Sequence, residues 1–408
     1  MLIVQKFGGT SVGSLERIEK VAERVKKSVQ AGNSVVVVVS AMSGETNKLI
    51  SYARHFSDQP SEREMDLLLS SGERVTSALL TIALKSKDID SVSLSGRGAG
   101  IVTDQHHTKA RIESIDSKPI LSEIADGKVV VVAGFQGVND NGDVTTLGRG
   151  GSDLSAVAVA GAIGADLCEI YTDVDGIYTT DPRIEPKAKK LEKISYDEML
   201  EMASLGAKVL QSRSVEMAKK LNVNLVTRSS FNENEGTLIT GEENIVEKPL
   251  VNGVALDKNQ ARLGLIGVKD RPGISSDIFG ALSDASINVD MIVQTVGHKG
   301  SNSEDLTNVA FTVSRDEVQK AKECLVKFKA NNDLQEIESD DSIVKVSIVG
   351  VGMKSHTGVA AKAFSAMAGE NINILMISTS EIKVSMIIEE KYSELAVRTL
   401  HSVYELDK

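Results

Sequence analysis

One segment of this chain occurs twice, and this repeat constrains the fold of the C-terminal part more than any other feature. Residues 271–292 match residues 356–377 without a gap. Two copies are too few for a solenoid, so we expect two small duplicated domains. The positions that coincide are Gly273/Gly358, Phe279/Phe364, Ala281/Ala366, Ile287/Ile372, Asn288/Asn373, Met291/Met376 and Ile292/Ile377.

Each copy has the pattern strand, helix, strand, strand, helix. In the first copy these elements are expected at 262–268, 274–285, 288–296, 308–313 and 318–328, with a fourth strand at 333–338. In the second copy they are expected at 344–349, 358–369, 373–379, 383–389 and 395–406.

The second copy has no fourth strand after its last helix. An unpaired sheet edge favours unwanted association, so a strand from elsewhere should cover it. The spare strand at 251–257 precedes the first copy, and we expect it to complete the second domain. The first domain, 262–340, would then be nested inside the second, 341–408.

The first 245 residues show a different pattern, in which Val/Ile-rich runs alternate with amphipathic segments. Strands are expected at 2–5, 34–40, 128–134 and 167–173, and helices at 15–31, 64–85 and 152–164. This alternation predicts an α/β domain with a mostly parallel sheet covered by helices on both faces. Ligands in such sheets bind beyond the carboxyl ends of the strands.

The loop 145–153, Thr-Thr-Leu-Gly-Arg-Gly-Gly-Ser-Asp, is the most informative segment for function. Its glycines allow backbone N–H groups to approach an anion, and Arg149 can bind a carboxylate or phosphate through two parallel hydrogen bonds. Asp153 would repel an anion but attract an ammonium group. A loop with both charges suits a zwitterion such as a free amino acid, although a plain strand-to-helix turn is the simpler alternative.

Other polar loops follow predicted strands. Lys6-Phe-Gly-Gly precedes the first helix, and its glycines and lysine suit a phosphate, but it lacks the Walker spacing. Residues 40–46 offer hydroxyl groups for a carboxylate or a helix cap. Glu73 lies in an apolar helical run, where it could bind an ammonium group or face solvent. Residues 171–183 suit a ribose and adenine, or form an ordinary surface loop.

Composition excludes several classes of partner. The net charge of −11 and the aromatic content of 3%, without tryptophan, disfavour nucleic acid, which needs basic and stacking surfaces. No apolar run is long enough to span a membrane, and no signal peptide pattern is present. Cys168 and Cys324 fit no metal spacing, and we expect His106 and His107 to be surface residues. We therefore expect a cytoplasmic protein with no metal site of its own.

The loops, taken together and in order, resemble the aspartate kinases of the amino-acid kinase family. The resemblance rests on residues 6–12, 40–42, 71–74, 134–137, 145–153 and 172–183, and the repeat resembles the tandem ACT domains of that family. It implies an amino-acid kinase fold followed by two ferredoxin-like βαββαβ domains. It also implies MgATP-dependent phosphorylation of the β-carboxylate of L-aspartate, the first step toward lysine, threonine and methionine.

The resemblance assigns roles to individual residues. For catalysis it implies Lys6, Arg149 and Asp153. For aspartate it implies Ser40, Thr46, Glu73, Arg149, Gly150, Gly151 and Ser152. For ATP it implies Lys6, Phe7, Gly8, Gly9, Thr172, Asp173, Tyr178, Asp181, Arg183 and Lys208. Magnesium would arrive with the nucleotide.

The repeats would sense amino acids and pair side by side in a homodimer. The resemblance implies lysine or threonine, or both, as effectors, bound by Asp270, Gly273, Ile274, Ser275, Asn288, Asp290 and Gln294. Which amino acid inhibits, and whether a shorter regulatory subunit exists, are left open. Two other functions also remain open, a different amino-acid kinase and a non-catalytic sensor that could dispense with Lys6 and Arg149.

Overall fold

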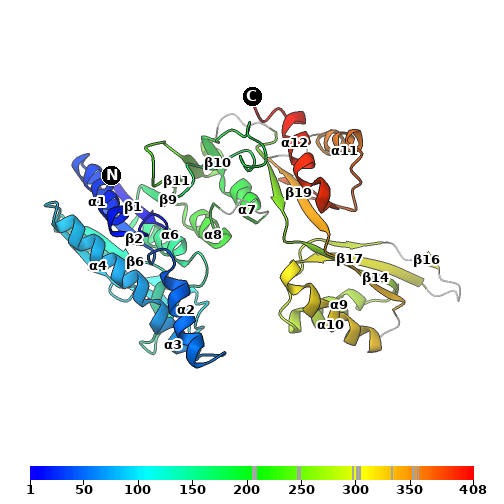
Figure 1. Cartoon of the computed structure of the whole chain (residues 1–408), viewed down its shortest axis with the longest axis horizontal. Helices are drawn as coiled ribbons and strands as arrows, with labels where there is room; N and C mark the ends of the chain where they lie inside the picture. Colours follow the sequence, from blue (N-terminus) through cyan, green and yellow to red (C-terminus); the bar gives the residue numbers. More distant parts are fainter. Residues whose placement is uncertain are drawn as a thin grey trace. The chain divides into compact units, whose positions relative to one another are not determined.

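The structure is a computed structural model that describes residues 1–204, 209–245, 250–295, 298–299, 305–331, 334–351, 353, 356 and 358–408. These residues divide into two compact units, drawn in Figure 1. The first unit holds Met1–Tyr178, Lys190–Ser204 and residues 209–245. The second holds Thr179–Lys189 and the described residues from 250 onward.

An eight-stranded sheet forms the core of the first unit, in the order β10-β12-β11-β9-β1-β2-β6-β3. Its neighbours are parallel except for β11 and β12. The valines of β2 and β6 are all buried, because helices cover both faces of the sheet. The strands are β1 (Leu2–Phe7), β2 (Ser34–Val39), β3 (Ser91–Leu94), β6 (Val129–Ala133), β9 (Leu167–Thr172), β10 (Lys193–Ser195), β11 (Leu225–Ser229) and β12 (Thr237–Thr240).

Helices α1 (Leu15–Gln30) and α4 (Ser71–Lys85) pack on one face, where their apolar side chains meet those of β1, β2 and β6 in one core. Helix α6 (Gly151–Ile163) covers the opposite face, and it is buried almost all round because α8 (Ser212–Leu221) packs against its outer side. The remaining helices of this unit are α2 (Glu45–Phe56), α3 (Glu62–Leu69), α5 (Lys118–Ala125), α7 (Tyr196–Ser204) and the 3-10 turn η1 (Glu242–Asn244).

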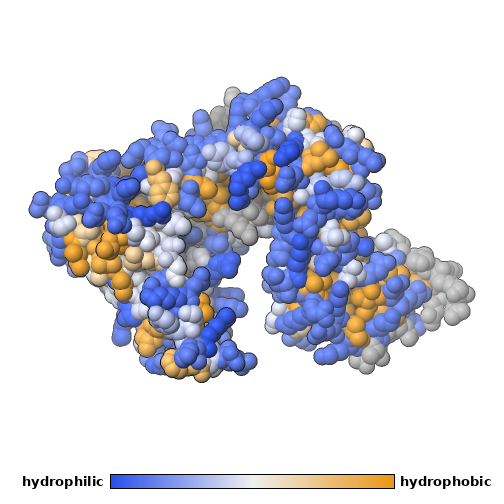
Figure 2. Space-filling view, viewed as in Figure 1, coloured by the Kyte–Doolittle hydropathy of each residue, from blue (hydrophilic) through white to orange (hydrophobic). Residues whose placement is uncertain are grey.

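The expected helix 64–85 is two helices, α3 and α4, which meet at the buried Ser70. By length and composition alone, Glu62–Lys85 could cross a membrane, but half of its most apolar window is buried. The core helix of a globular domain passes the same test, and α4 does pack against β3 and β6. Figure 2 shows a hydrophobic patch over α4, whose exposed apolar residues include Val75 and Ile82.

A small sheet lies beside the carboxyl ends of the large one, in the order β5-β4-β7-β8. Its strands are β4 (Ile101–Thr103), β5 (Ile112–Ile115), β7 (Gln136–Val138) and β8 (Val144–Thr146). Strand β7 follows β6 almost directly, and β8 leads into the loop 147–150 before α6. This sheet therefore positions the loop 147–150, which forms part of the candidate site.

The described residues of the second unit form two antiparallel sheets of similar build, one of five strands and one of four. The first has the order β15-β17-β14-β18, with β16 pairing β17 at one end. Its elements are β14 (Ala261–Lys269), α9 (Ile274–Asp284), β15 (Ile292–Gln294), β16 (His298–Lys299), β17 (Asp305–Val313), the 3-10 turn η2 (Arg315–Glu317), α10 (Val318–Asn331) and β18 (Glu336–Asp340).

The second sheet has the order β13-β19-β21-β20. Strand β13 pairs antiparallel with β19, from Gly253↔Val349 to Asp257↔Lys345, and takes the place that β18 has in the first sheet. The first repeat thus lies in the sequence between two paired strands of the second. The elements are β13 (Gly253–Asp257), β19 (Ile343–Val349), α11 (Val359–Gly369), β20 (Met376–Thr379), β21 (Lys383–Glu389), the 3-10 turn η3 (Glu390–Tyr392) and α12 (Ser393–Val403).

One segment crosses the expected boundary at residue 245. Thr179–Lys189 interrupts the first unit in sequence but packs within the second. The carbonyl of Thr179 accepts from the N–H of Val254 (2.7 Å), and the Thr179 hydroxyl lies 2.9 Å from His401 Nε2. Arg398 Nε also donates to the carbonyl of Ile184 (2.9 Å). Burial lowers the pKa of His401, which favours the neutral ring at this contact.

Candidate active site

The register of the large sheet aligns four strand ends at one edge. Phe7 is paired with Tyr171 on one side and Val39 on the other, and Val39 is paired with Ala133. The residues that follow are therefore neighbours at this edge, namely Gly8, Ser40, Gly134 and Thr172. Ligand-binding loops were expected after these strands, and the register explains why the loops converge.

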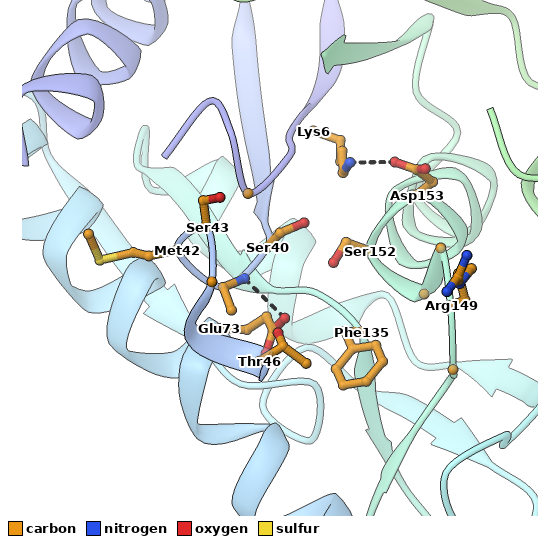
Figure 3. A pocket seen from close by; sticks show the side chains of 16 residues that line it. Lys6, Ser40, Met42, Ser43, Thr46, Glu73, Phe135, Arg149, Ser152 and Asp153 are labelled. Carbon is orange, nitrogen blue, oxygen red and sulfur yellow. Dashed lines mark hydrogen bonds and ion pairs between the residues drawn. The ribbon is translucent and has the colours of Figure 1, made fainter. Parts of the chain in front are cut away.

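Lys6 is the last charged residue of β1 and is almost fully buried, with 8% of its surface exposed. Its Nζ forms an ion pair with Asp153 Oδ1 at 2.6 Å, and Asp153 lies in the first turn of α6 (Figure 3). The carboxylate is favoured there by the helix dipole. A Cβ on Gly8 would lie 3.2 Å from Lys6 Nζ, so glycine leaves the ammonium group accessible beside the turn.

Glu73 is buried in the first turn of α4, with 4% of its surface exposed. Its Oε1 accepts a hydrogen bond from the Ala41 N–H at 3.0 Å. Among the residues that the structure describes, its Oε2 has no hydrogen-bond partner. Burial raises the pKa of Glu73 to about 7, because the charged form loses water without a compensating cation. This carboxylate is therefore prepared for a positively charged partner.

The site has two walls. Lys6 and Glu73 belong to the first wall, and Arg149 lies on the second, between Gly148 and Gly150. Both glycines have left-handed φ angles, 74° and 72°, which other residues rarely adopt. A Cβ on Gly150 would also meet Gln211 Cγ at 2.1 Å. In the described part of the chain, the exposed Arg149 side chain has no hydrogen-bond or ion-pair partner, so its donors are available for a ligand.

These groups line one pocket of about 290 Å³ (Figure 3). Figure 3 shows Glu73 and Arg149 approaching it from different elements, with Ser40 and Ser152 between them. The pocket brings together the expected catalytic and aspartate-binding residues, which the sequence places up to 147 positions apart. The lining consists of Lys6, Gly9, Ser40, Ala41, Met42, Ser43, Gly44, Thr46, Glu73, Phe135, Gly148, Arg149, Gly150, Gly151, Ser152 and Asp153.

Phe135 is a pocket residue that the sequence analysis did not single out. It has a left-handed φ of 68°, which is strained for an aromatic residue, and its N–H donates to Ser155 Oγ (3.0 Å). A Cβ on the neighbouring Gly151 would lie 2.8 Å from the Phe135 ring. Its position within the block 134–137 was the available signal, but the backbone angle could not be deduced from that block.

The expected nucleotide residues are only partly brought together. Phe7 stacks on Tyr171 with ring centroids 4.6 Å apart and is fully buried, so only its backbone can face a ligand. Thr172 Oγ1 donates to Asp173 (3.1 Å), and Tyr178 OH donates to Asp175 (2.7 Å). Burial and this bond to Asp175 raise the pKa of Tyr178 to about 12.

Two further nucleotide residues, Asp181 and Arg183, belong to the segment that packs in the second unit. They form an ion pair with each other at 2.7 Å. Lys208 lies outside the described residues. The role of all three in nucleotide binding stays a prediction.

The loop after β11 also reaches this edge, and the sequence analysis missed it. Ser230 Oγ lies 2.5 Å from Ser11 Oγ in the first glycine turn, and the Ser230 N–H donates to the Thr172 carbonyl (2.9 Å). Asn234 donates to Asp175 at 2.8 Å. These contacts connect residues far apart in sequence, so no local motif indicates them.

The expectation that His107 is a surface residue is wrong. Its ring is half-buried, and Nδ1 lies 2.7 Å from Oδ2 of the fully buried Asp66. His106 is exposed, as expected. Within the described residues, no group of three or more His, Cys, Asp or Glu could hold a metal ion.

The expected effector residues lie in the first repeat, and they differ in availability. Gly273, with φ 94°, is the N-cap of α9, while Ile274 is buried in the repeat's core. Ser275 Oγ donates to Gln294 Oε1 (3.0 Å). Asp290 forms an ion pair with Lys345 of the second repeat. Asp270 and Asn288 are exposed.

Comparison with known proteins divides the chain into an N-terminal domain and two C-terminal repeats. Residues 1–228 match the model of the amino acid kinase family, and residues 265–330 and 346–404 each match a model of the ACT domain. The first match alone covers more than half of the chain.

Curated relatives match over the whole length. The aspartokinase of Helicobacter pylori is 59% identical over 100% of both chains. The aspartate kinase of Pseudomonas putida is 56% identical over 100% of this chain and 98% of its own. The aspartokinase of Corynebacterium glutamicum is 47% identical over 99% and 96%.

Two solved structures of Escherichia coli aspartokinase III are also similar. The complex with aspartate and ADP, described as the R-state, has a TM-score of 0.81 and is 26% identical, covering 99% of both chains. The complex with lysine and aspartate, described as the T-state, has a TM-score of 0.78 and is 27% identical, covering 98% of this chain and 99% of its own.

Proposed function

Because the chain belongs to the amino acid kinase family, as an aspartokinase with two ACT domains, we propose that it transfers a phosphoryl group from ATP to the β-carboxylate of L-aspartate. The product would be 4-phospho-L-aspartate. The reaction would open the route to lysine, threonine and methionine.

The observation that carries this proposal is the unsatisfied carboxylate of Glu73 in a pocket that also holds Arg149 and Lys6. A buried carboxylate oxygen without a partner costs free energy, which a ligand ammonium group would recover. L-Aspartate has one ammonium group and two carboxylates. We assign the ammonium group to Glu73, one carboxylate to Arg149 and the reacting carboxylate to the side of Lys6.

The first glycine turn fits a nucleotide phosphate. A Cβ on Gly9 would come within 3.0 Å of the Ala41 carbonyl, so this position has no room for a side chain. The Gly8 N–H donates to the Tyr171 carbonyl (3.3 Å), which fixes the turn and leaves the Gly9 amide to face a ligand. ATP, when bound, supplies the phosphoryl group together with its magnesium ion. Lys6 would hold the transferring group by charge, and the Gly9 amide would donate to one of its oxygens. Asp153 would keep the Lys6 ammonium group in place.

Thr172, Asp173 and Tyr178 would bind the nucleotide beyond the phosphates. They lie at the end of β9 and in the loop after it, and β9 is next to the strand that carries Lys6. The Asp175 carboxylate fixes the Tyr178 hydroxyl, which supports a preformed loop. Magnesium would come with the nucleotide, because Mg²⁺ is usually bound by substrate phosphates and by few protein carboxylates.

The ACT domains would bind lysine or threonine, or both, as feedback inhibitors. Polar side chains of the first repeat support this role. They are Ser275 and Gln294, which are hydrogen-bonded to each other, and Asp290. We expect Asp290→Ala and Gln294→Ala to relieve inhibition while leaving uninhibited turnover unchanged. Retained inhibition in both variants would contradict this role.

We also propose a homodimer formed through the ACT domains. Strands β15 and β20 lie at sheet edges and carry Ile292 and Ile377, the same repeat position, which are 52% and 43% exposed. Paired edges would cover both. Light scattering of the purified chain would show twice the mass of 43.6 kDa, whereas the mass of the single chain would contradict the dimer.

The test of the main proposal is ATP consumption with L-aspartate, L-glutamate or N-acetyl-L-glutamate, each with and without lysine, threonine or both. We expect turnover with aspartate alone, suppressed by an end product. Turnover only with a glutamate derivative would identify a different amino-acid kinase. No turnover with any substrate would leave an amino-acid sensor.

A further inference from the structure

Arg149 lies in a turn that is closed by a backbone hydrogen bond from the Gly151 N–H to the Gly148 carbonyl (3.0 Å). The two flanking glycines have left-handed φ angles and no side chains to pack, and the Arg149 side chain is exposed. We call Arg149 the aspartate clamp, because it is proposed to bind a carboxylate of aspartate. A flexible clamp binds more weakly, because ordering it on binding costs conformational entropy. The direction in which this turn presents Arg149 therefore also depends on the contacts that hold the residues just before Gly148.

Arg213, in the first turn of α8, makes two such contacts. Its Nη1 donates to the Leu147 carbonyl at 2.7 Å, and its Nη2 donates to the Ala110 carbonyl at 3.2 Å. Leu147 directly precedes Gly148. One guanidinium group thus joins two carbonyls from separate segments, which lysine cannot do with the same fixed geometry.

The other hydrogen bonds around Leu147 explain why its carbonyl needs this contact. Asp66 holds the other side of the strand end by accepting from Thr146 Oγ1 (2.5 Å) and from the Thr108 N–H (3.0 Å). The Ala110 N–H donates to the Thr146 carbonyl at 2.9 Å. Leu147 donates its N–H to the Phe135 carbonyl (2.9 Å), so Arg213 completes its backbone pairing.

Arg213 differs from the other residues that hold this loop, because its side chain lies at the surface and not in the core. Its side chain is exposed, whereas Asp66 is fully buried. Removing Asp66 would leave several buried donors unpaired, whereas removing Arg213 takes one donor group away from the carbonyls of Leu147 and Ala110, two fully buried residues. Because the Arg213 side chain itself is exposed, we expect Arg213→Ala to lose some stability but to fold, so that its effect on the loop can be measured.

We propose that Arg213 is a positioning residue for the aspartate clamp. It holds Leu147 so that Arg149 projects toward the pocket in the orientation that binds a carboxylate. Arg213 does not contact the pocket itself, since it is absent from the pocket lining, and it acts only through Arg149. This inference rests on the proposed function, because it assumes that Arg149 binds aspartate.

The first test is Arg213→Ala, with Arg213→Lys as the conservative variant. We expect the KM for aspartate to rise about tenfold, a modest loss of binding free energy, while the KM for ATP stays within about twofold. Arg213→Lys should give an intermediate value, since lysine can still reach one carbonyl. Lys220→Ala, an exposed residue of the same helix, is the matched control and should leave both constants unchanged.

A double-mutant cycle with Arg149→Ala separates positioning from general stabilisation. If Arg213 acts through Arg149, then Arg213→Ala should have little further effect on kcat/KM for aspartate in the Arg149→Ala protein. Equal and additive losses in both backgrounds would overturn the proposal. So would an unchanged KM for aspartate in Arg213→Ala.

The outcomes distinguish this inference from the proposed function. If Arg149→Ala weakens aspartate use but Arg213→Ala does not, only the positioning role fails. If the unaltered protein shows no aspartate-dependent turnover, the proposed function fails, and the positioning role fails with it. Millimolar guanidinium ion should restore part of the aspartate affinity of Arg213→Ala and leave the KM of Lys220→Ala unchanged, and no restoration in Arg213→Ala would count against the proposal.

Discussion

The two walls of the pocket hold their charges in different ways. Lys6 and Glu73 are buried, at 8% and 4% exposure, on a strand and a helix of the main fold. Arg149 is exposed on a loop between two left-handed glycines. A buried charge acts strongly in a low dielectric but costs free energy when unpaired, whereas an exposed one depends on its placement. The first wall should therefore determine chemistry and pH dependence, and the second should determine how precisely aspartate is held.

The largest effect should follow loss of the buried cation. Lys6→Met removes the charge at similar length, and we expect kcat to fall by about 10²- to 10³-fold, as when an oxyanion donor is removed. The KM for aspartate should change much less. Asp153 would also lose its partner, so the melting temperature should fall and Lys6→Met/Asp153→Asn should restore it without restoring kcat. A near-normal kcat in Lys6→Met would contradict the assignment.

Glu73→Gln should have the next largest effect. The amide keeps an oxygen for the Ala41 N–H but removes the charge that would bind the ammonium group. We expect kcat/KM for aspartate to fall by about 30- to 100-fold, the usual size for one partner of a buried charge pair. The same variant should unfold at a higher temperature at pH 8, because the unpaired buried carboxylate is gone. A simultaneous loss of affinity for ATP would argue that Glu73 is structural.

The pH dependence of aspartate use should reveal Glu73 directly. Its pKa is raised to about 7, so the carboxylate is mostly protonated at pH 6 and mostly ionised at pH 8. The KM for aspartate should fall about tenfold over this interval, since only the ionised form binds the ammonium group. In Glu73→Gln the KM should be flat. A flat profile in the unaltered protein would mean that Glu73 does not bind this group.

The same pKa predicts how stability depends on pH. The Glu73 pKa is raised above its ordinary value of 4.5, so the folded protein binds more protons than the unfolded chain between pH 4.5 and about 7. The contribution of Glu73 is fully present below pH 4.5 and is lost as pH rises through 7, by about 3 kcal/mol. Aspartate should recover part of this loss above pH 7, which thermal melting with and without aspartate would measure.

The smallest effect should come from the loop of the second wall. Gly150→Ala places a Cβ at φ 72° and close to Gln211, and we expect the KM for aspartate to rise about five- to tenfold from backbone strain. Gly32→Ala is the matched control, because Gly32 has φ 84° but open space around it, far from the pocket lining. Both variants should lose stability from the left-handed φ, Gly150→Ala more so because of Gln211, but only Gly150→Ala should alter the KM. An equal KM for aspartate in both variants would contradict the claim that the second wall determines how precisely aspartate is held.

Sequence patterns predicted the elements whose residues repeat locally. The valine runs of β2 and β6 and the apolar face of α1 gave the layers of the first unit. The repeat indicated two equivalent sheets, and the missing fourth strand pointed to the residues that form β13. The charged pocket residues were recognised because each lies in a glycine-rich or hydroxyl-rich loop after a strand, or in a short motif of the family.

The contacts that position the site could not be predicted in this way. Arg213 lies 66 positions from Leu147, and Asp66 lies 80 positions from Thr146. Such hydrogen bonds depend on how elements pack, and they leave no periodic pattern in the sequence. The same reason explains the error at His107 and the segment Thr179–Lys189, whose packing is set by β13 and α12 rather than by its neighbours in sequence.

The most direct test of the account is the rate of ADP formation with L-aspartate or succinate, measured in the unaltered protein and in Glu73→Gln at pH 8. Succinate has both carboxylates of aspartate but lacks the ammonium group. We predict that the unaltered protein strongly prefers aspartate and that Glu73→Gln loses most of this preference by losing activity on aspartate. Equal rates with both substrates in the unaltered protein, or an undiminished preference in Glu73→Gln, would contradict the account.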